Sequence, residues 1–350
     1  MAEDDSLLLQ EEEMFEHFRF VSDKGQGLLR VDKYITEHME QVSRHRVQLA
    51  IDAGYVRVND KVVKANYKVK PLDVITIVMP YQRRGFEVVP ENIPLDIVYE
   101  DEDLLVVNKP PGLVVHPGHG HITGTLVNAL AYHLCISQGP DGEDDRMGIL
   151  VHRIDKDTSG LLLVAKNEDA QMFLSRQFFY HTIERTYVAL VWGNVAEDSG
   201  TIEGNIGRDP NDRMRFKVFP EGDQGKTAVT HFRVLERFGY VTLVECKLET
   251  GRTHQIRVHM NYIGHPLFND DRYGGDRVLK GPLYTKYKQF IDNCFAIMPR
   301  QALHAKTLGF THPRTRKEVF FDSEIPADMQ ALLDKWRKYA SRLSEAVEID

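Results

Sequence analysis

Apolar residues recur with helical spacing near the N-terminus and alternate with polar residues over much of the remaining chain. In residues 28–80, Val31, Tyr34 and Ile35 share one helical face, and residues 47–51 form a second apolar cluster of the same kind. This pattern predicts two short helices in that part of the chain.

Capping and turn residues mark the ends of these elements. Ser43 is a favourable N-cap for the second helix, and Gly54 is expected to end it. Residues 55–64 then alternate between apolar and polar side chains around a turn at Asn59 and Asp60. We therefore predict a small N-terminal α/β module of two helices and a sheet.

Strand patterns dominate the rest of the chain, with a helical pattern at 168–180. Many of these strands follow one another as hairpins, which favours antiparallel pairing over a doubly wound parallel sheet. The predicted fold class is α+β, with a mixed, mainly antiparallel central sheet and flanking helices. Strands are expected in two segments from Ile97 onward and at 161–166, 186–193, 231–238 and 240–248.

Changes in composition divide the chain into five regions. Residues 1–24 contain eight acidic and two basic residues, which is typical of a solvated tail. A stretch with prolines and few periodic apolar positions separates the module from the remainder. We expect an acidic tail at 1–27, the module at 28–80, a linker at 81–96, a main domain at 97–325 and a C-terminal helix at 326–350.

Composition and charge narrow the function classes. The 350 residues are 42% hydrophobic and 27% charged, as in globular proteins with a sizeable core. We expect neither a membrane span nor a secretory signal, and three cysteines far apart in sequence fit a cytoplasmic protein without a disulfide framework. The net charge of -8 argues against a simple basic nucleic-acid binder, but residues 28–80 carry a net charge of +3.

The segment 148–160, GILVHRIDKDTSG, places polar residues between two apolar strands, where functional sites often lie. Asp155 is flanked by Arg153 and Lys156, so its carboxylate should stay ionised. An ionised carboxylate beside an arginine can act as a nucleophile or a general base. The alternative is a solvated turn with a surface ion pair.

A second polar segment, LETGRTHQIRVH at 248–259, suits contact with phosphate or carboxylate. If it is a strand, Gln255, Arg257 and His259 share one polar face and His254 lies on the other. A metal site is disfavoured, because the spacing of the two histidines is not a standard ligand spacing and no acidic partner is fixed nearby.

The segment 108–121, NKPPGLVVHPGHGH, is more simply a shaped loop of proline and glycine than a histidine metal site. The sequence also lacks a phosphate-binding glycine loop, a dinucleotide fingerprint and a serine nucleophile elbow. We therefore expect no nucleotide cofactor and no metal.

Several motifs together resemble the RluA-type family of RNA pseudouridine synthases. HRIDKDTSG is similar to the family signature H-R-L-D-x-x-T-S-G, with Ile154 in place of leucine, and ERTYVAL is similar to a Lys-x-Tyr motif, with Arg185 in place of lysine. Residues 28–80 resemble an S-four-type RNA-binding module, and the combination is most similar to the RluD subfamily, which modifies large-subunit ribosomal RNA. Further similar motifs, in order, are NKPPGLVVHP, LETGRTHQIRVH, GHPLFNDDRYG and RQALHAKTLGFTHP.

The resemblance implies a role for each matching residue. Asp155 is the expected catalytic nucleophile, paired with Arg257, in a reaction that breaks the bond from uracil nitrogen to ribose and rejoins the base through a ring carbon. Arg153 is expected to fill the gap left by a flipped-out uridine, and Tyr187 to lie against the flipped base. Such chemistry requires no cofactor.

The module is expected to contact RNA phosphates, and the expected partner is large-subunit ribosomal RNA in a ribosome precursor particle. The same chemistry on transfer RNA and a non-catalytic role in ribosome assembly remain as alternatives. We further expect a monomer without a membrane partner. The candidate RNA-binding residues are Arg30, Lys33, Arg44, Arg46, Lys61, Lys64 and Lys68.

Overall fold

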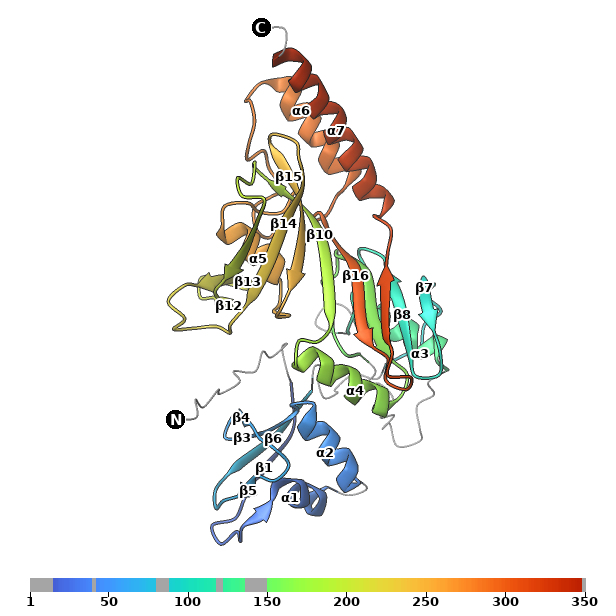
Figure 1. Cartoon of the computed structure of the whole chain (residues 1–350), viewed down its shortest axis with the longest axis vertical. Helices are drawn as coiled ribbons and strands as arrows, with labels where there is room; N and C mark the ends of the chain where they lie inside the picture. Colours follow the sequence, from blue (N-terminus) through green and yellow to red (C-terminus); the bar gives the residue numbers. More distant parts are fainter. Residues whose placement is uncertain (1–14, 40–41, 80–87, 118–121, 136–149, 348–350) are drawn as a thin grey trace.

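The computed structural model describes residues 15–39, 42–79, 88–117, 122–135 and 150–347. In Figure 1 the N-terminal module lies at one end of the molecule, a long sheet occupies the middle, and two helices extend from the other end. Much of the predicted linker, the last two histidines of the loop at 108–121 and the start of the segment at 148–160 lie outside the described residues.

The N-terminal module contains the two helices and the hairpin that the sequence predicts. Its elements are β1 (Phe15–Val21), β2 (Leu29–Arg30), α1 (Val31–His38), α2 (Arg44–Asp52), β3 (Val56–Val58), β4 (Lys61–Val62), β5 (Lys68–Val69) and β6 (Val74–Met79). The Ser43 side chain accepts a hydrogen bond from the backbone N–H of Arg46 and caps α2. Asn59 and Asp60 both have positive φ, as a tight hairpin turn between β3 and β4 requires.

Part of the predicted acidic tail is a strand of this module. Residues 15–21 form β1, which pairs antiparallel with β6 at the edge of a sheet ordered β1-β6-β3-β4. Phe18 and Phe20 pack against the core of the module. The prediction of an acidic tail over residues 1–27 was wrong for this segment. The many acidic residues before it outweighed the short alternation of apolar side chains that indicates a strand.

The main sheet has nine strands and is mixed, which confirms the predicted fold class. Its path is β11-β14-β15-β10-β16-β9-β8-β7, with β17 paired to β16. Among the described residues, β16 pairs with β9 in parallel and the other neighbours on this sheet pair antiparallel. The strands are β7 (Ile97–Glu100), β8 (Leu104–Lys109), β9 (Ser159–Ala165), β10 (Glu184–Trp192), β11 (Ser199–Glu203), β14 (Val229–Arg237), β15 (Val241–Leu248), β16 (Leu303–Thr311) and β17 (Glu318–Asp322).

Helices cover both faces of this sheet. Alternate residues of β10 point to opposite faces, as the period of a strand requires: Ala189 packs in one core, and Leu190 in another. The first core also contains residues of α3 (Leu126–His133) and α5 (Gln255–Tyr262), and the second contains residues of α6 (Thr285–Ile297) and α7 (Ala327–Val347). No helix in the described part of the chain is long and apolar enough to cross a bilayer.

The strand considered for residues 248–259 is not present. Strand β15 ends at Leu248 and helix α5 begins at Gln255, so Gln255, Arg257 and His259 do not share a strand face. The segment is too short for alternation over a few residues to be told from one helical turn. Helix α5 packs on the same face of the sheet as Tyr187.

Helix α4 (Glu168–Phe179) connects the module to the main sheet (Figure 1). Its Met172 packs in the core of the module, and its Glu168 forms an ion pair with Arg46 of α2. On its other side, Leu174 packs against β8 and β9. One helix thus contributes to two cores.

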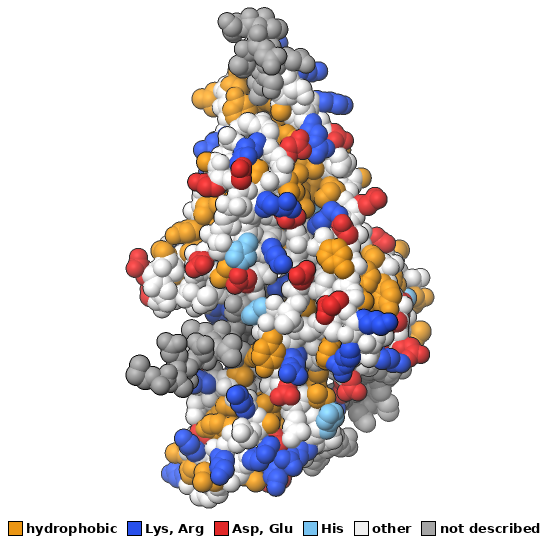
Figure 2. Space-filling model, viewed as in Figure 1, with side chains coloured by type: hydrophobic (Ala, Val, Ile, Leu, Met, Phe, Trp, Pro, Cys, Tyr) orange, Lys and Arg blue, Asp and Glu red, His pale blue; other side chains and the backbone are white. Residues whose placement is uncertain are grey.

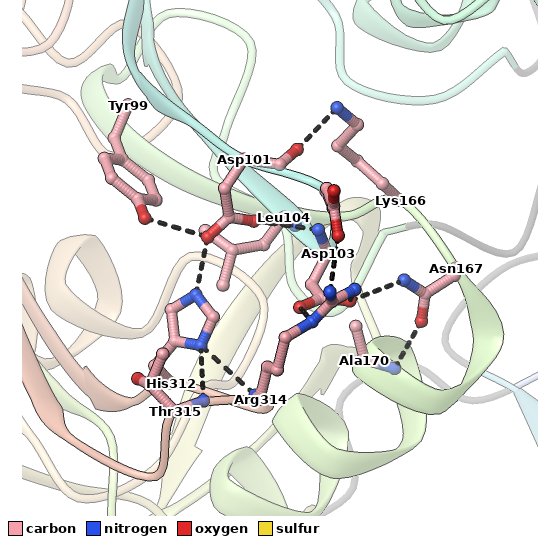
Figure 3. Close-up of polar contacts among 11 residues, drawn as sticks. Tyr99, Asp101, Asp103, Leu104, Lys166, Asn167, Ala170, His312, Arg314 and Thr315 are labelled. Atoms are coloured by element: carbon pink, nitrogen blue, oxygen red, sulfur yellow. Dashed lines mark hydrogen bonds and ion pairs between the residues drawn. The ribbon is translucent and has the colours of Figure 1, made fainter.

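A polar cluster holds the beginning of α4 to the loops at the edge of the sheet (Figure 3). Arg314 donates two hydrogen bonds to Asp103, which also accepts one from Asn167, the N-cap of α4. His312 lies 2.6 Å from a carboxylate oxygen of Asp101. Asp101, Asp103 and His312 lie close enough to share a cation, but protein donors already use both carboxylates.

Candidate active site

An open pocket of about 450 Å³ lies where the loop after residue 150, β10 and the turn before α5 meet. This volume includes space that is open to solvent. The pocket brings together all four main-domain residues that the sequence analysis selected. Polar residues that line it include Arg153, Asp155, Arg185, Tyr187, His254 and Arg257.

An arginine held between two carboxylates forms the centre of the site. Arg257 on α5 donates from Nη1 to Asp155 Oδ2 at 3.0 Å. Its Nε and Nη2 donate to the two carboxylate oxygens of Asp270 at 2.7 and 2.8 Å. Asp270 is fully buried and also accepts the backbone N–H groups of Arg272 and Tyr273. Asp270 therefore fixes the guanidinium, which presents its remaining nitrogen to Asp155.

Sequence reasoning missed the role of Asp270. The residue lies within GHPLFNDDRYG, but two adjacent aspartates in a loop do not reveal which of them faces an arginine on a preceding helix. The pairing depends on the packing of that loop beneath α5.

Asp155 is held in its ionised form. Burial alone would raise the pKa of its carboxyl, but His254, Arg257 and Arg153 together bring the pKa below its usual value. Because burial lowers the pKa of His254 itself to about 4, the permanent charge of Arg257 provides the attraction at neutral pH. The side chain of Asp155 remains 22% exposed, so the ionised carboxylate is accessible from the pocket.

Tyr187 and Arg153 line the pocket in different settings. Tyr187 is on β10, buried on the face of the sheet that packs against α5. Arg153 is exposed, two residues before Asp155. The pocket thus contains a buried aromatic ring, against which a base could stack. It also contains an exposed guanidinium, which could fill the gap that such a base leaves in the RNA.

Two buried basic residues support the loop that carries Asp155. Lys109 is fully buried, and its Nζ donates to the carbonyl oxygens of Pro110, Leu113 and Lys156. His152 accepts the backbone N–H of Leu163 through Nε2, and burial lowers its pKa to about 3, so the ring is neutral. The Lys109 side chain therefore joins the NKPPG segment to the loop that follows HRID.

Gly160 in the same motif is required by close packing between strands. Its φ is +112°, and a Cβ atom would lie 2.2 Å from the carbonyl oxygen of Ala305. This is where β9 and β16 run in parallel. Glycine is thus needed for the backbone to approach that closely.

The lining of the pocket suits an anionic ligand. Arg185, which stands where the family motif has lysine, is buried and lies with its guanidinium 5.0 Å from the centre of the Phe178 ring. Arg153, Arg252 and Arg257 also line the pocket, so its lining carries more positive than negative charge. Such a lining favours phosphate over a bound cation.

The structure brings together only some of the candidate RNA-binding residues of the module. Arg30 and Arg44 both donate to the buried carboxylate of Asp32, and Arg30 pairs across the strands with exposed Lys68. Arg46 instead pairs with Glu168 of α4. Figure 2 shows Lys and Arg side chains gathered over the end of the molecule that the module occupies. The remaining candidates, Lys33, Lys61 and Lys64, are exposed.

Comparison with known proteins agrees with these features. Residues 103–262 match the family described as RNA pseudouridylate synthase, and residues 29–75 match the S4 domain. The chain is 48% identical over 309 residues to an uncharacterized RNA pseudouridine synthase of Bacillus subtilis, covering 88% of this chain and 94% of that protein. It is 43% identical to the ribosomal large subunit pseudouridine synthase D of Zymomonas mobilis, covering 87% of this chain and 92% of that protein.

A solved structure supports the same assignment. The structure of human RNA pseudouridylate synthase domain containing 1 is similar with a TM-score of 0.51 and 30% identity, covering 69% of this chain and 89% of that one. The chain therefore belongs to the RluA-type family of RNA pseudouridine synthases, and it is an isomerase that acts on RNA.

Proposed function

We propose that this enzyme converts specific uridines of large-subunit ribosomal RNA to pseudouridine, with Asp155 as the nucleophile. The contact between Asp155 and Arg257, at 3.0 Å inside a pocket lined by Tyr187, carries the proposal. It combines an ionised carboxylate, a partner that keeps it ionised and an aromatic wall. The names of relatives at 43–45% identity support the choice of RNA.

The chemistry needs an ionised carboxylate at the start. In the reaction, the bond between uracil N1 and ribose C1′ breaks, the base turns, a bond forms between C5 and C1′, and the hydrogen on C5 is lost as N1 gains one. Attack by Asp155 on the sugar and attack on the ring both begin from the carboxylate. Because substrate and product have the same atoms, no group has to be supplied or removed.

Access to the uridine requires that it leave the stacked RNA, which costs a few kcal/mol. Arg153 is exposed at the edge of the pocket and can occupy the space that the base vacates. Tyr187 offers a ring against which the base can stack, which is worth about 1–3 kcal/mol. Together these two contacts offset much of the cost of flipping.

The module supplies further RNA contacts. Buried Asp32 orients the exposed guanidinium groups of Arg30 and Arg44, and Lys68 lies beside Arg30. Phosphate contacts of this kind position RNA without choosing bases. We therefore propose that the enzyme selects its substrate by binding a large folded RNA with the module and the main domain together. Transfer RNA is the alternative substrate.

Pseudouridine mapping of RNA from a deletion strain tests the proposal. A carbodiimide that marks pseudouridine causes reverse-transcriptase stops, and we expect stops to be lost from large-subunit ribosomal RNA. Wild-type enzyme should restore them and the Asp155→Asn variant should not, although it should still bind RNA. Loss of stops in transfer RNA alone would favour the alternative substrate, and no lost stop in any RNA would favour a non-catalytic assembly factor.

A further inference from the structure

His254 occupies an unusual backbone conformation beside the proposed nucleophile. It is the residue at which the turn after β15 becomes helix α5, and its φ is +57°. Its ring lines the pocket that contains Asp155. Non-glycine residues are disfavoured in this left-handed region, and they persist mainly where the surrounding structure holds them, often at functional sites.

A chain of hydrogen bonds determines which ring nitrogen of His254 carries hydrogen. The backbone N–H of Phe216, on β13 (Asp212–Phe219), donates to Tyr273 Oη at 3.1 Å, and this oxygen lies 2.9 Å from His254 Nδ1. Burial raises the pKa of Tyr273 to about 12, so the hydroxyl stays protonated. The oxygen accepts the Phe216 amide hydrogen, and Nδ1 is within hydrogen-bond distance as an acceptor for the hydroxyl hydrogen, which favours donation from Tyr273 to Nδ1.

The imidazole is neutral, so its single hydrogen lies on Nε2. Burial lowers the pKa of His254 to about 4, against the attraction of the nearby carboxylates. The charged groups around the ring are the carboxylates of Asp155 and Asp270 and the guanidinium groups of Arg257 and Arg272. With Nδ1 occupied as an acceptor, the neutral ring must donate from Nε2.

This nitrogen faces the carboxylate oxygen of Asp155 that Arg257 does not bind. Arg257 Nη1 lies 3.0 Å from Oδ2, whereas His254 Nε2 lies 3.9 Å from Oδ1. The second distance is too long for a direct hydrogen bond. Catalytic hydrogen bonds in unliganded enzymes often shorten when substrate binds. A small shift of either side chain would bring Nε2 and Oδ1 within hydrogen-bond distance.

We propose that His254 is a positioning residue, which donates its Nε2 hydrogen to Oδ1 of Asp155 and, with Arg257, fixes the rotation of the carboxylate. Tyr273 acts through His254 by setting its tautomer. The inference rests on the proposed role of Asp155 as nucleophile. Each carboxylate oxygen has two acceptor sites, so Oδ1 can accept this hydrogen and still attack the substrate. A neutral donor orients the carboxylate without protonating it.

A pair of substitutions separates the donor from the rest of the side chain. In His254→Gln the amide nitrogen reaches about as far as imidazole Nε2, whereas in His254→Asn it reaches only about as far as Nδ1. Asparagine also tolerates positive φ well, so backbone strain would not explain a loss in that variant. Thermal unfolding of both variants checks that they fold.

Single-turnover rates on a uridine-containing RNA provide the test. We expect His254→Asn to be about 10- to 100-fold slower than wild type at unchanged RNA affinity, and His254→Gln to recover most of the rate. The acid limb of the rate should move to higher pH in His254→Asn. Tyr273→Phe should slow the wild type but have no further effect when combined with His254→Asn, since no ring remains to orient.

Specific outcomes would overturn the inference. These are a wild-type rate and acid limb in His254→Asn, equal rates for the two folded His254 variants, or additive effects of the Tyr273 and His254 substitutions. Asp155→Asn, measured alongside, separates this inference from the proposed function. If it is active, the nucleophile assignment fails; if it is inactive while His254→Asn is unimpaired, the positioning role of His254 alone fails.

Discussion

Replacing Asp270 with asparagine should damage both the stability and the chemistry of the enzyme. Asp270 is fully buried and accepts two hydrogen bonds from Arg257 and two from backbone N–H groups. Asparagine keeps the shape but removes the charge and turns one acceptor toward Arg257 into a donor. Breaking a buried ion pair from one side costs about 3–5 kcal/mol, because the other charge stays buried without a partner.

The same substitution should slow the reaction through Arg257. Loss of its anchor leaves Arg257 free to shift from Asp155, which should lower the single-turnover rate about 10- to 100-fold. Urea unfolding measures the loss of stability, and tritium release from C5-labelled RNA measures the loss of rate.

Asp103→Asn is a matched control, because Asp103 also binds an arginine through two hydrogen bonds but does not line the pocket. It should lose stability and keep its rate once folded. An Asp270→Asn enzyme within about 0.5 kcal/mol of wild type and equally fast would refute the reasoning.

Three further substitutions test other parts of the account. Arg257→Gln should raise the pKa of Asp155; because the active form is the carboxylate, the rate should then be lost at higher pH as the solution is acidified, and an unmoved acid limb would contradict this. Gly160→Ala should destabilise the fold by more than about 1 kcal/mol in urea unfolding, because the new methyl group meets the backbone of β16, whereas a neutral result would mean that the strands can separate there. Lys68→Gln should weaken RNA binding and reduce the slope of log affinity against log salt by about 1, whereas an unchanged slope would remove Lys68 from the RNA contact.

Local sequence patterns were sufficient to predict elements whose ends are marked by their own capping or turn residues. Ser43 and the pair Asn59 and Asp60 mark a helix start and a hairpin turn, and both features are present where predicted. The hairpin-like spacing of strands also indicated a mainly antiparallel sheet. Such signals depend on neighbouring residues and need no knowledge of the rest of the fold.

Local sequence patterns were insufficient to predict contacts between residues that are far apart in the chain. Asp155 and Arg257 are 102 residues apart, and their pairing was expected from resemblance to a family rather than from any periodicity. The anchoring role of Asp270 and the tautomer of His254 depend on contacts that form only after α5 packs on the sheet. Strand β1 needs β6, more than 50 residues later in sequence, as its partner.

Tritium release from RNA labelled at uracil C5 is the most direct measurement of the central claim. Joining C5 to the ribose displaces the C5 hydrogen, so each converted uridine should release one tritium. Wild-type enzyme should release tritium from large-subunit ribosomal RNA, and Asp155→Asn should release none while binding the same RNA with similar affinity. Release by Asp155→Asn at the wild-type rate would contradict the assignment of this carboxylate as the nucleophile.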